Sequence, residues 1–222
     1  MVILKKKDET DLQGLLEFYA QWKDRIAVRL EEFRHKYKKG SEEDIFEELT
    51  FCLMTPQSKA KSCWATANDL RCKGLMLEGD CDCLSKQMNR VRFRNHKASY
   101  IIEARRTFTT NKKVHLKAKI DEFTDPIELR QWLVDTVKGL GFKEASHFLR
   151  NIGFGSELAI LDRHILKNLK RFGAISEIPR NLSKKKYLEI EKRMRKFSRD
   201  IGIPMDHLDL VFWCKQTGEI FK

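Results

Sequence analysis

The stretch that decides the fold is Val137-Lys138-Gly139-Leu140-Gly141-Phe142-Lys143-Glu144-Ala145-Ser146-His147-Phe148-Leu149-Arg150. One amphipathic helix ends at its Gly-Leu-Gly turn, and a second helix begins at once. The glycines at 139 and 141 allow positive φ and a close approach of the backbone to a partner, while Leu140 can pack back between the helices. The pattern therefore predicts a helical hairpin.

The hairpin predicts a particular chemistry at its turn. Unpaired backbone N–H groups point outward at the start of the second helix, where the helix dipole is positive. Such a turn suits a DNA phosphate and reads no base sequence. This is a helix–hairpin–helix signature, although a Gly-x-Gly turn taken alone is more often an ordinary corner between two helices.

Two residues near the hairpin carry possible catalytic chemistry. Lys143 lies in the first turn of the second helix, and a neutral lysine amine is a nucleophile that forms Schiff bases. Taken alone, a lysine at this position is more often one that contacts phosphate or solvent. Asp162 follows the apolar residues 158–161. An aspartate there favours a helix N-cap, and it could also accept a proton from Lys143 or stabilise positive charge on a sugar ring.

The rest of the chain predicts an all-α protein of about ten helices, because apolar residues recur every three or four positions. Gly40 ends the first helix, Ser41 with Asp44 begins the second in the manner of a capping box, and Thr55-Pro56-Gln57 breaks it. No strand is expected, since no stretch alternates with period two. The expected helices lie at about residues 12–33, 41–53, 58–70, 97–106, 126–137, 144–150, 163–171, 183–200 and 204–216.

Composition points to a folded protein with a polyanionic partner. The chain has 222 residues and carries a net charge of +12. Its hydrophobic fraction of 41% is too high for wholesale disorder. Eleven Lys and Arg residues oppose a single acid between positions 84 and 119, and thirteen oppose three acids between 163 and 199. These two basic segments favour a nucleic acid, although solvated helix faces are the commoner reason for charge runs.

Other classes are disfavoured by what the sequence lacks. The ten uncharged residues at 49–58 fall short of the ~18 to 20 apolar residues of a membrane-spanning helix. Charges from Lys5 to Glu9 interrupt any secretory signal, so we expect a cytoplasmic protein. The six cysteines include no Cys-x-x-Cys pair and no carboxy-terminal iron–sulphur pattern. Reduced thiols are expected, with metal or redox chemistry at Cys72, Cys81 and Cys83 as the alternative.

The motifs together resemble a known superfamily. Gly139-Leu140-Gly141-Phe142-Lys143 and Leu161-Asp162-Arg163-His164 are similar to the two signatures of the HhH-GPD DNA glycosylases. The chain looks most like the archaeal-type (type 2) 8-oxoguanine DNA glycosylase/AP lyases within that superfamily. The turn Thr55-Pro56-Gln57-Ser58, the stretch from 143 to 151 and the carboxy-terminal lysine fit this type. The likeness extends from about residue 43 to the end.

The resemblance implies a fold and a mechanism. One helical subdomain would span residues 43–151, and residues 1–42 and 152–222 would form the other, with the active site in a cleft between them. Lys143 would attack C1′ of the damaged nucleotide and form a Schiff base, while Asp162 assists its deprotonation. β-Elimination would then nick the strand, without any metal or cofactor.

The resemblance also implies a partner and a set of binding residues. The partner would be double-stranded DNA containing 8-oxoguanine, and the enzyme would be a monomer. Gly139, Leu140 and Gly141 would hold the DNA backbone, and Gln57 would enter the DNA near the vacated position. Trp213 would stack on the flipped base. The terminal carboxylate of Lys222 would accept hydrogen bonds from the Watson–Crick edge of the base.

Three alternatives remain open at the level of sequence. The first is a bifunctional glycosylase for oxidised pyrimidines or another lesion. The second is a non-catalytic helix–hairpin–helix protein, which would bind DNA in a salt-sensitive way and need neither Lys143 nor Asp162. The third is a basic helical RNA-binding protein, which no aromatic-rich strand motif supports.

Overall fold

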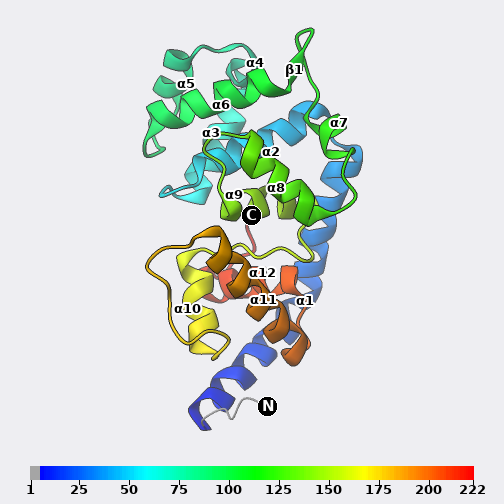
Figure 1. The fold of residues 1–222 in the computed structure, drawn as a ribbon, viewed down its shortest axis with the longest axis vertical. Coiled ribbons are helices and arrows are strands. Elements are labelled where there is room, and N and C mark those ends of the chain that lie inside the picture. The colour runs from blue at the N-terminus through cyan, green and yellow to red at the C-terminus, as the bar shows by residue number, and fades with distance from the viewer. Residues whose placement is uncertain (1–5) are drawn as a thin grey trace. The chain divides into compact units, whose positions relative to one another are not determined.

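The computed structural model describes residues 6–222, with side chains described from Thr10 onward. Within that range it contains twelve helices and one two-stranded sheet (Figure 1). The all-α class predicted from the sequence is therefore confirmed. The helices are α1 Lys6–Lys39, α2 Glu42–Met54, α3 Ala60–Cys72, α4 Leu75–Glu78, α5 Cys81–Gln87, α6 Arg94–Phe108, α7 Leu116–Ile120, α8 Pro126–Thr136, α9 Phe142–Asn151, α10 Arg163–Arg171, α11 Lys184–Ile201 and α12 Met205–Thr217.

The chain packs into two compact units. One runs from Phe33 to Gly153, and the other combines the residues up to Glu32 with Phe154–Lys222. The boundaries expected from the sequence were 42/43 and 151/152. Helix α1 contributes residues to both units, because it continues without a break from Lys6 to Lys39. Residues 1–5 of the expected second subdomain lie outside the described residues.

Helix α2 is the centre of the Phe33–Gly153 unit. It packs against α3, α6, α7 and α9, and every residue from Ile45 to Met54 is buried. A helix that is buried all round needs apolar residues on every face, and this one also carries two buried glutamates. The predicted capping box is confirmed, since Ser41 and Asp44 exchange their side-chain and backbone hydrogen bonds at its start.

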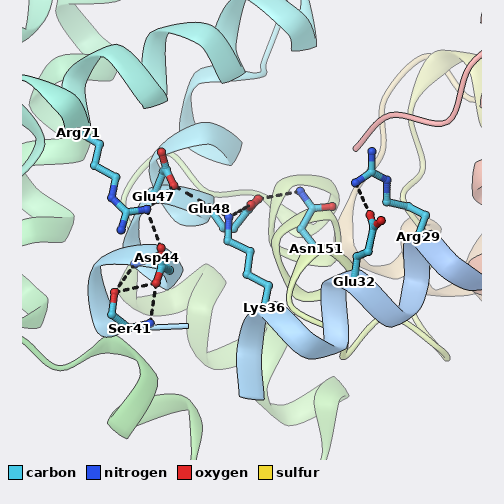
Figure 2. Close-up of polar contacts among 9 residues, drawn as sticks. All are labelled: Arg29, Glu32, Lys36, Ser41, Asp44, Glu47, Glu48, Arg71 and Asn151. Carbon is cyan, nitrogen blue, oxygen red and sulfur yellow. Dashed lines mark hydrogen bonds and ion pairs between the residues drawn. The ribbon is translucent and has the colours of Figure 1, made fainter. Parts of the chain in front are cut away.

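The buried glutamates of α2 are paired with residues from neighbouring helices (Figure 2). Glu48 is fully buried, and it accepts hydrogen bonds from Lys36 Nζ (2.5 Å) and from Asn151 Nδ2 (3.1 Å). Glu47 and Asp44 both accept from Arg71 Nη1, at 2.9 and 2.6 Å. These pairs fix the carboxy-terminal ends of α1 and α9 and the last turn of α3 against α2.

The strands are a correction to the sequence prediction, which expected none. β1 (Thr109–Thr110) and β2 (Lys113–Val114) pair antiparallel. Asn111 and Lys112 connect them with φ values of 52° and 62°, the conformation of a type I′ hairpin turn. Two-residue strands are too short to show an alternating pattern, so periodicity could not reveal them.

The other unit contains the first part of α1 with α10, α11 and α12. Helix α12 packs against both α10 and α11. The rings of Phe172 and Phe212 stack at 5.7 Å, and Phe172 also stacks on Phe197 at 6.0 Å. This aromatic core lies at the end of α10, where Phe172 is the C-cap, while the helix start follows the buried residues Leu158, Ala159, Ile160 and Leu161.

Candidate catalytic site

The Gly-Leu-Gly turn joins α8 to α9 as the sequence predicted. Gly139 has a φ of 84°, and a Cβ at this position would lie 2.3 Å from Cδ2 of Tyr100. Glycine is therefore required at 139 both for its backbone conformation and for space. Leu140 is 3% exposed, so its side chain anchors the turn to the core while the two glycines remain exposed.

Gly141 is the N-cap of α9 and provides no side-chain cap. The N–H groups in the first turn of a helix have no acceptor within the helix, and the dipole is positive there. The start of α9 can therefore bind an anion such as a DNA phosphate. The sequence placed the helix start at about 144, but α9 begins at Phe142, so Lys143 is its second residue.

Lys143 lies in the first turn of α9, at the end of the helix that is not buried. Its side chain is 27% exposed, and Nζ forms an ion pair with Glu144 Oε1 at 2.9 Å. The remainder of α9, from Ala145 to Asn151, is buried. The amine thus stands at the edge of the unit on a helix whose other residues are fixed by packing, which is the arrangement that a positioned nucleophile needs.

Asp162 is the N-cap of α10, as one of the two sequence interpretations held. Its Oδ1 accepts a hydrogen bond from Ile165 N at 2.7 Å. Within residues 10–222, this is the one side-chain hydrogen bond recorded for Asp162. The cap fixes the carboxylate through Oδ1, and the residue is partly exposed.

The turn that carries Gln57 has an unusual backbone. Gln57 is exposed and has a φ of 55°, a left-handed conformation that non-glycine residues rarely adopt. Ser58 N donates to Thr55 O at 3.0 Å, which closes a four-residue turn with proline second and the left-handed residue third. This is the pattern of a type II turn, where glycine is the usual third residue.

Trp213 and Lys222 lie in the same unit as Asp162. Trp213 is half-buried on α12, and its ring packs edge-on against His164 with centroids 6.1 Å apart. Its Nε1 is buried, with no hydrogen-bond partner found within the described part of the chain. His164 Nε2 donates to Phe212 O at 2.7 Å, which fixes the ring beside Asp162. Lys222 is partly exposed at the end of the chain.

The proposed site residues thus fall into two groups. Lys143, the hairpin and Gln57 belong to the Phe33–Gly153 unit. Asp162, Trp213 and Lys222 belong to the other unit.

Sequence reasoning missed two residues near Gln57. Lys97 was expected only as the start of a helix, but it is 4% exposed and donates to the turn that carries Gln57. Phe93 is 53% exposed with a φ of 58°, and the preceding Arg92 N donates to Ser58 Oγ at 3.0 Å. For Lys97, the sequence did offer one sign of burial, because this lysine stands next to apolar residues of α6. No sequence signal marked the second.

Charge around this turn is positive. Arg90, Arg92 and Arg94 are exposed in the segment that leads into α6, and Lys59 is exposed immediately after the turn. The basic segment predicted at 84–119 therefore contributes exposed cations beside Gln57. Such a surface favours a polyanion.

The described residues form neither a membrane-spanning helix nor a metal site. No helix among residues 6–222 is long and apolar enough to cross a membrane. The same part of the chain holds no group of three or more His, Cys, Asp or Glu residues arranged to bind a metal ion. All six cysteines are free thiols, including the exposed Cys72, Cys81 and Cys83.

The fold and the hairpin define a helix–hairpin–helix DNA glycosylase architecture, and comparison with known proteins specifies the family. The family described as 8-oxoguanine DNA glycosylase (Ogg-HhH) matches residues 26–203. The 8-oxoguanine DNA glycosylase/AP lyase of Fusobacterium nucleatum is 41% identical over 206 residues, which cover 93% of this chain and 95% of that protein. The chain therefore belongs to the 8-oxoguanine DNA glycosylase family.

Solved structures agree with this assignment. The crystal structure of the 8-oxoguanine DNA glycosylase of Thermotoga maritima has a TM-score of 0.85 at 34% identity, covering 97% of this chain and all of that chain. The Methanocaldococcus jannaschii 8-oxoguanine glycosylase/lyase, in complex with 15mer DNA containing 8-oxoguanine, also has a TM-score of 0.85 at 34% identity. It covers 96% of this chain and all of that chain.

Proposed function

We propose that the protein is a bifunctional DNA glycosylase/AP lyase that excises 8-oxoguanine from duplex DNA and then cleaves the strand at the abasic site. The observation that carries this function is the Gly139–Gly141 hairpin with Lys143 in the first turn of α9. Relatives that align with this chain over nearly its full length are named for both the glycosylase and the AP lyase activity. The two activities require one nucleophile, and Lys143 is the residue we assign to it.

The DNA backbone is bound by the hairpin and by the basic surface. The start of α9 offers backbone N–H groups to one phosphate, and the exposed cations of the basic segments contact others. These contacts fix the register of the duplex without reading its sequence. The target nucleotide must leave the base stack before any side chain can reach it, at a cost of a few kcal/mol.

Asp162 takes a proton from the ammonium of Lys143, and the resulting amine attacks C1′ as the N-glycosidic bond breaks. The departing base takes the bonding electrons and the proton held by Asp162, whose carboxylate then balances the positive charge at C1′. The nitrogen bonded to C1′ passes a proton to the ring oxygen as the C1′–O4′ bond breaks, which leaves an open sugar with an iminium at C1′.

Strand cleavage follows from the same intermediate. Loss of a proton from C2′ expels the 3′ phosphate by β-elimination, and hydrolysis of the iminium then regenerates the lysine. No step needs a metal or cofactor, because the protein supplies the nucleophile and the base, and the DNA supplies both leaving groups.

We assign recognition of the base to the other unit. Trp213 is half-buried, so part of its indole remains exposed for stacking on the base. The terminal carboxylate of Lys222 accepts hydrogen bonds from the Watson–Crick edge of the flipped base. These two roles rest on the family resemblance of the carboxy-terminal sequence.

Gln57 enters the duplex at the position that the flipped nucleotide leaves. A glutamine at the third position of a turn that favours glycine costs conformational energy, and this cost supports a role for its side chain. The enzyme acts as a monomer on chromosomal DNA in the cytoplasm. A non-catalytic hairpin protein and a glycosylase for another lesion are the alternatives that the test below separates.

Borohydride trapping on duplexes with a single lesion tests the function. A covalent adduct should form with 8-oxoguanine and not with undamaged DNA, and Lys143→Gln should abolish it while DNA binding is retained. Lys73→Gln is the matched control, because Lys73 is an exposed lysine of the same unit that lies outside the basic segments. Adducts with thymine glycol in place of 8-oxoguanine would overturn the substrate. Binding without any adduct would overturn the lyase activity.

A further inference from the structure

Lys97 makes three hydrogen bonds to the segment around Gln57. Its Nζ donates to Met54 O at 2.7 Å, to Pro56 O at 2.6 Å and to Ser58 Oγ at 3.1 Å. An ammonium group has three N–H donors, so this set uses all of them. The side chain is 4% exposed, and Lys97 comes from α6, a different part of the chain.

The ammonium also occupies the end of α2. That helix ends at Met54 and has no basic residue in its own last turn. The carbonyl end of a helix carries partial negative charge and leaves its last C=O groups without partners in the helix. Lys97 supplies from α6 the cation that the sequence of α2 lacks. Burial lowers the pKa of Lys97, which indicates that the charge is held there against a desolvation penalty.

The acceptors of Lys97 lie on both sides of the strained residue. Pro56 directly precedes Gln57, and Ser58 directly follows it. A non-glycine residue with a φ of 55° persists only where its surroundings determine its conformation. Here Gln57 is held in that conformation by the three hydrogen bonds from Lys97 and by the bond from Ser58 N to Thr55 O.

Ser58 extends the same arrangement to a second segment. Its Oγ accepts from Lys97 Nζ and also from Arg92 N, at 3.0 Å, in the segment that precedes α6. One buried cation therefore fixes the Gln57 turn both to the end of α2 and to the start of α6. A turn fixed in this way is already formed before DNA binds, so binding does not have to order it.

We propose that Lys97 is a positioning residue, whose buried ammonium presets the Gln57 turn for entry into duplex DNA. This inference rests on the proposed function and deepens it. The three hydrogen bonds of Lys97 all go to residues 54–58, and its interaction with Lys143 is one of charge alone, which Lys97→Arg preserves. Loss of Lys97 should therefore affect the reaction on duplex DNA, where a nucleotide must be extruded, more than the reaction of Lys143 on a strand that is already single.

The experiment is a double-mutant cycle between Lys97→Met and Gln57→Ala, measured by single-turnover excision of 8-oxoguanine from duplex DNA. Lys97→Met alone should slow excision about ten- to hundredfold, since small misplacements have effects of that size. In the Gln57→Ala background, Lys97→Met should slow it by no more than about twofold further, because the two residues act as one unit. β-Elimination at an abasic site in a single-stranded oligonucleotide should change by less than about threefold.

Further variants keep the test decisive if Lys97→Met is poorly folded. Ser58→Ala removes one acceptor and the link to Arg92, and its smaller loss of duplex excision should likewise vanish in the Gln57→Ala background. Lys97→Arg keeps the charge and should recover part of the activity. Lys73→Met is the matched control, since Lys73 is exposed in the same unit but lies outside the Gln57 turn and the basic segments, and its loss should leave single-turnover excision nearly unchanged.

Two results would overturn the inference while the proposed function stands. One is an active wild type whose Lys97 and Gln57 effects multiply independently. The other is a Lys97→Met protein that loses duplex excision and single-strand β-elimination equally, as a general packing defect would cause. A wild type that removes no 8-oxoguanine would instead overturn the proposed function, and the inference would fall with it.

Discussion

The ring of Tyr100 lies directly against Gly139, where a Cβ would come within 2.3 Å of its Cδ2 atom. Gly139→Ala should therefore destabilise the hairpin twice, through this contact and through a φ of 84°. We expect a loss of about 1–3 kcal/mol of unfolding free energy and weaker binding to undamaged duplex DNA. Denaturant unfolding and a binding titration at fixed salt would measure the two effects.

Two comparisons separate these causes. Gly139→Ala combined with Tyr100→Ala relieves the contact but leaves the backbone strain, so it should recover only part of the stability. Gly14→Ala is the control for adding a methyl group, because nothing lies within 4 Å of a Cβ there and the residue is inside α1. It should raise stability by up to about 1 kcal/mol. A Gly139→Ala protein as stable as the wild type would contradict this account of the turn.

Asp162→Asn should separate the two roles of that carboxylate. Asparagine is as good an N-cap as aspartate, so it can still accept the hydrogen bond from Ile165 N and keep the start of α10. Unfolding free energy should change by less than about 0.5 kcal/mol, whereas Asp162→Ala should cost about 1 kcal/mol. Single-turnover excision by Asp162→Asn should fall by about 10² or more, because the negative charge and the base are lost. An active Asp162→Asn enzyme would show that Asp162 is only a cap.

The parts of the site that the sequence predicted are local ones. The Gly139–Gly141 turn and the N-cap at Asp162 depend on residues within a few positions, and capping and turn chemistry can be read over that range. Lys97 could not be predicted in this way, because its acceptors Met54, Pro56 and Ser58 lie 43, 41 and 39 positions away.

The same limit applies to the buried charges. Glu48 reads in the sequence as one more acid on a helix, and nothing nearby shows that it is fully buried. Its partner Asn151 is 103 residues away. The sequence does predict the helix that carries Glu48, because the hydrophobic periodicity and the Ser41–Asp44 cap are both local. Tertiary pairing of polar groups is the part that periodicity does not encode.

Asp44 should make stability depend on pH in the acid range. Burial opposes ionisation of this carboxyl, but hydrogen bonds from Ser41 and Arg71 outweigh it and lower the pKa to about 2. A depressed pKa in the folded state gives stability that is present above the unfolded value, near 4, and is lost as pH falls toward 2. We expect Asp44→Asn to cost about 2 kcal/mol at pH 7, with the gap to wild type closing between about pH 5 and pH 2.

Unfolding in denaturant at a series of pH values would check this dependence. Glu122→Gln is the control, since Glu122 is 59% exposed in its ion pair with Lys119 and should change stability by less than about 1 kcal/mol at any pH. A gap between wild type and Asp44→Asn that stays constant from pH 7 to pH 3 would contradict the assignment.

Gln57→Gly should separate the side chain of that residue from the turn that holds it. Glycine adopts a φ of 55° without strain, so the turn and its hydrogen bonds from Lys97 should persist. Thermal unfolding should stay within about 1 kcal/mol of wild type, because relief of strain offsets the greater freedom of the unfolded chain. Excision of 8-oxoguanine from duplex DNA should nevertheless fall about tenfold or more, since nothing then fills the vacated position and extrusion costs a few kcal/mol. β-Elimination on single-stranded DNA should be retained. If duplex excision survives in Gln57→Gly, the strained glutamine has no part in entering the DNA, and the turn serves the fold alone.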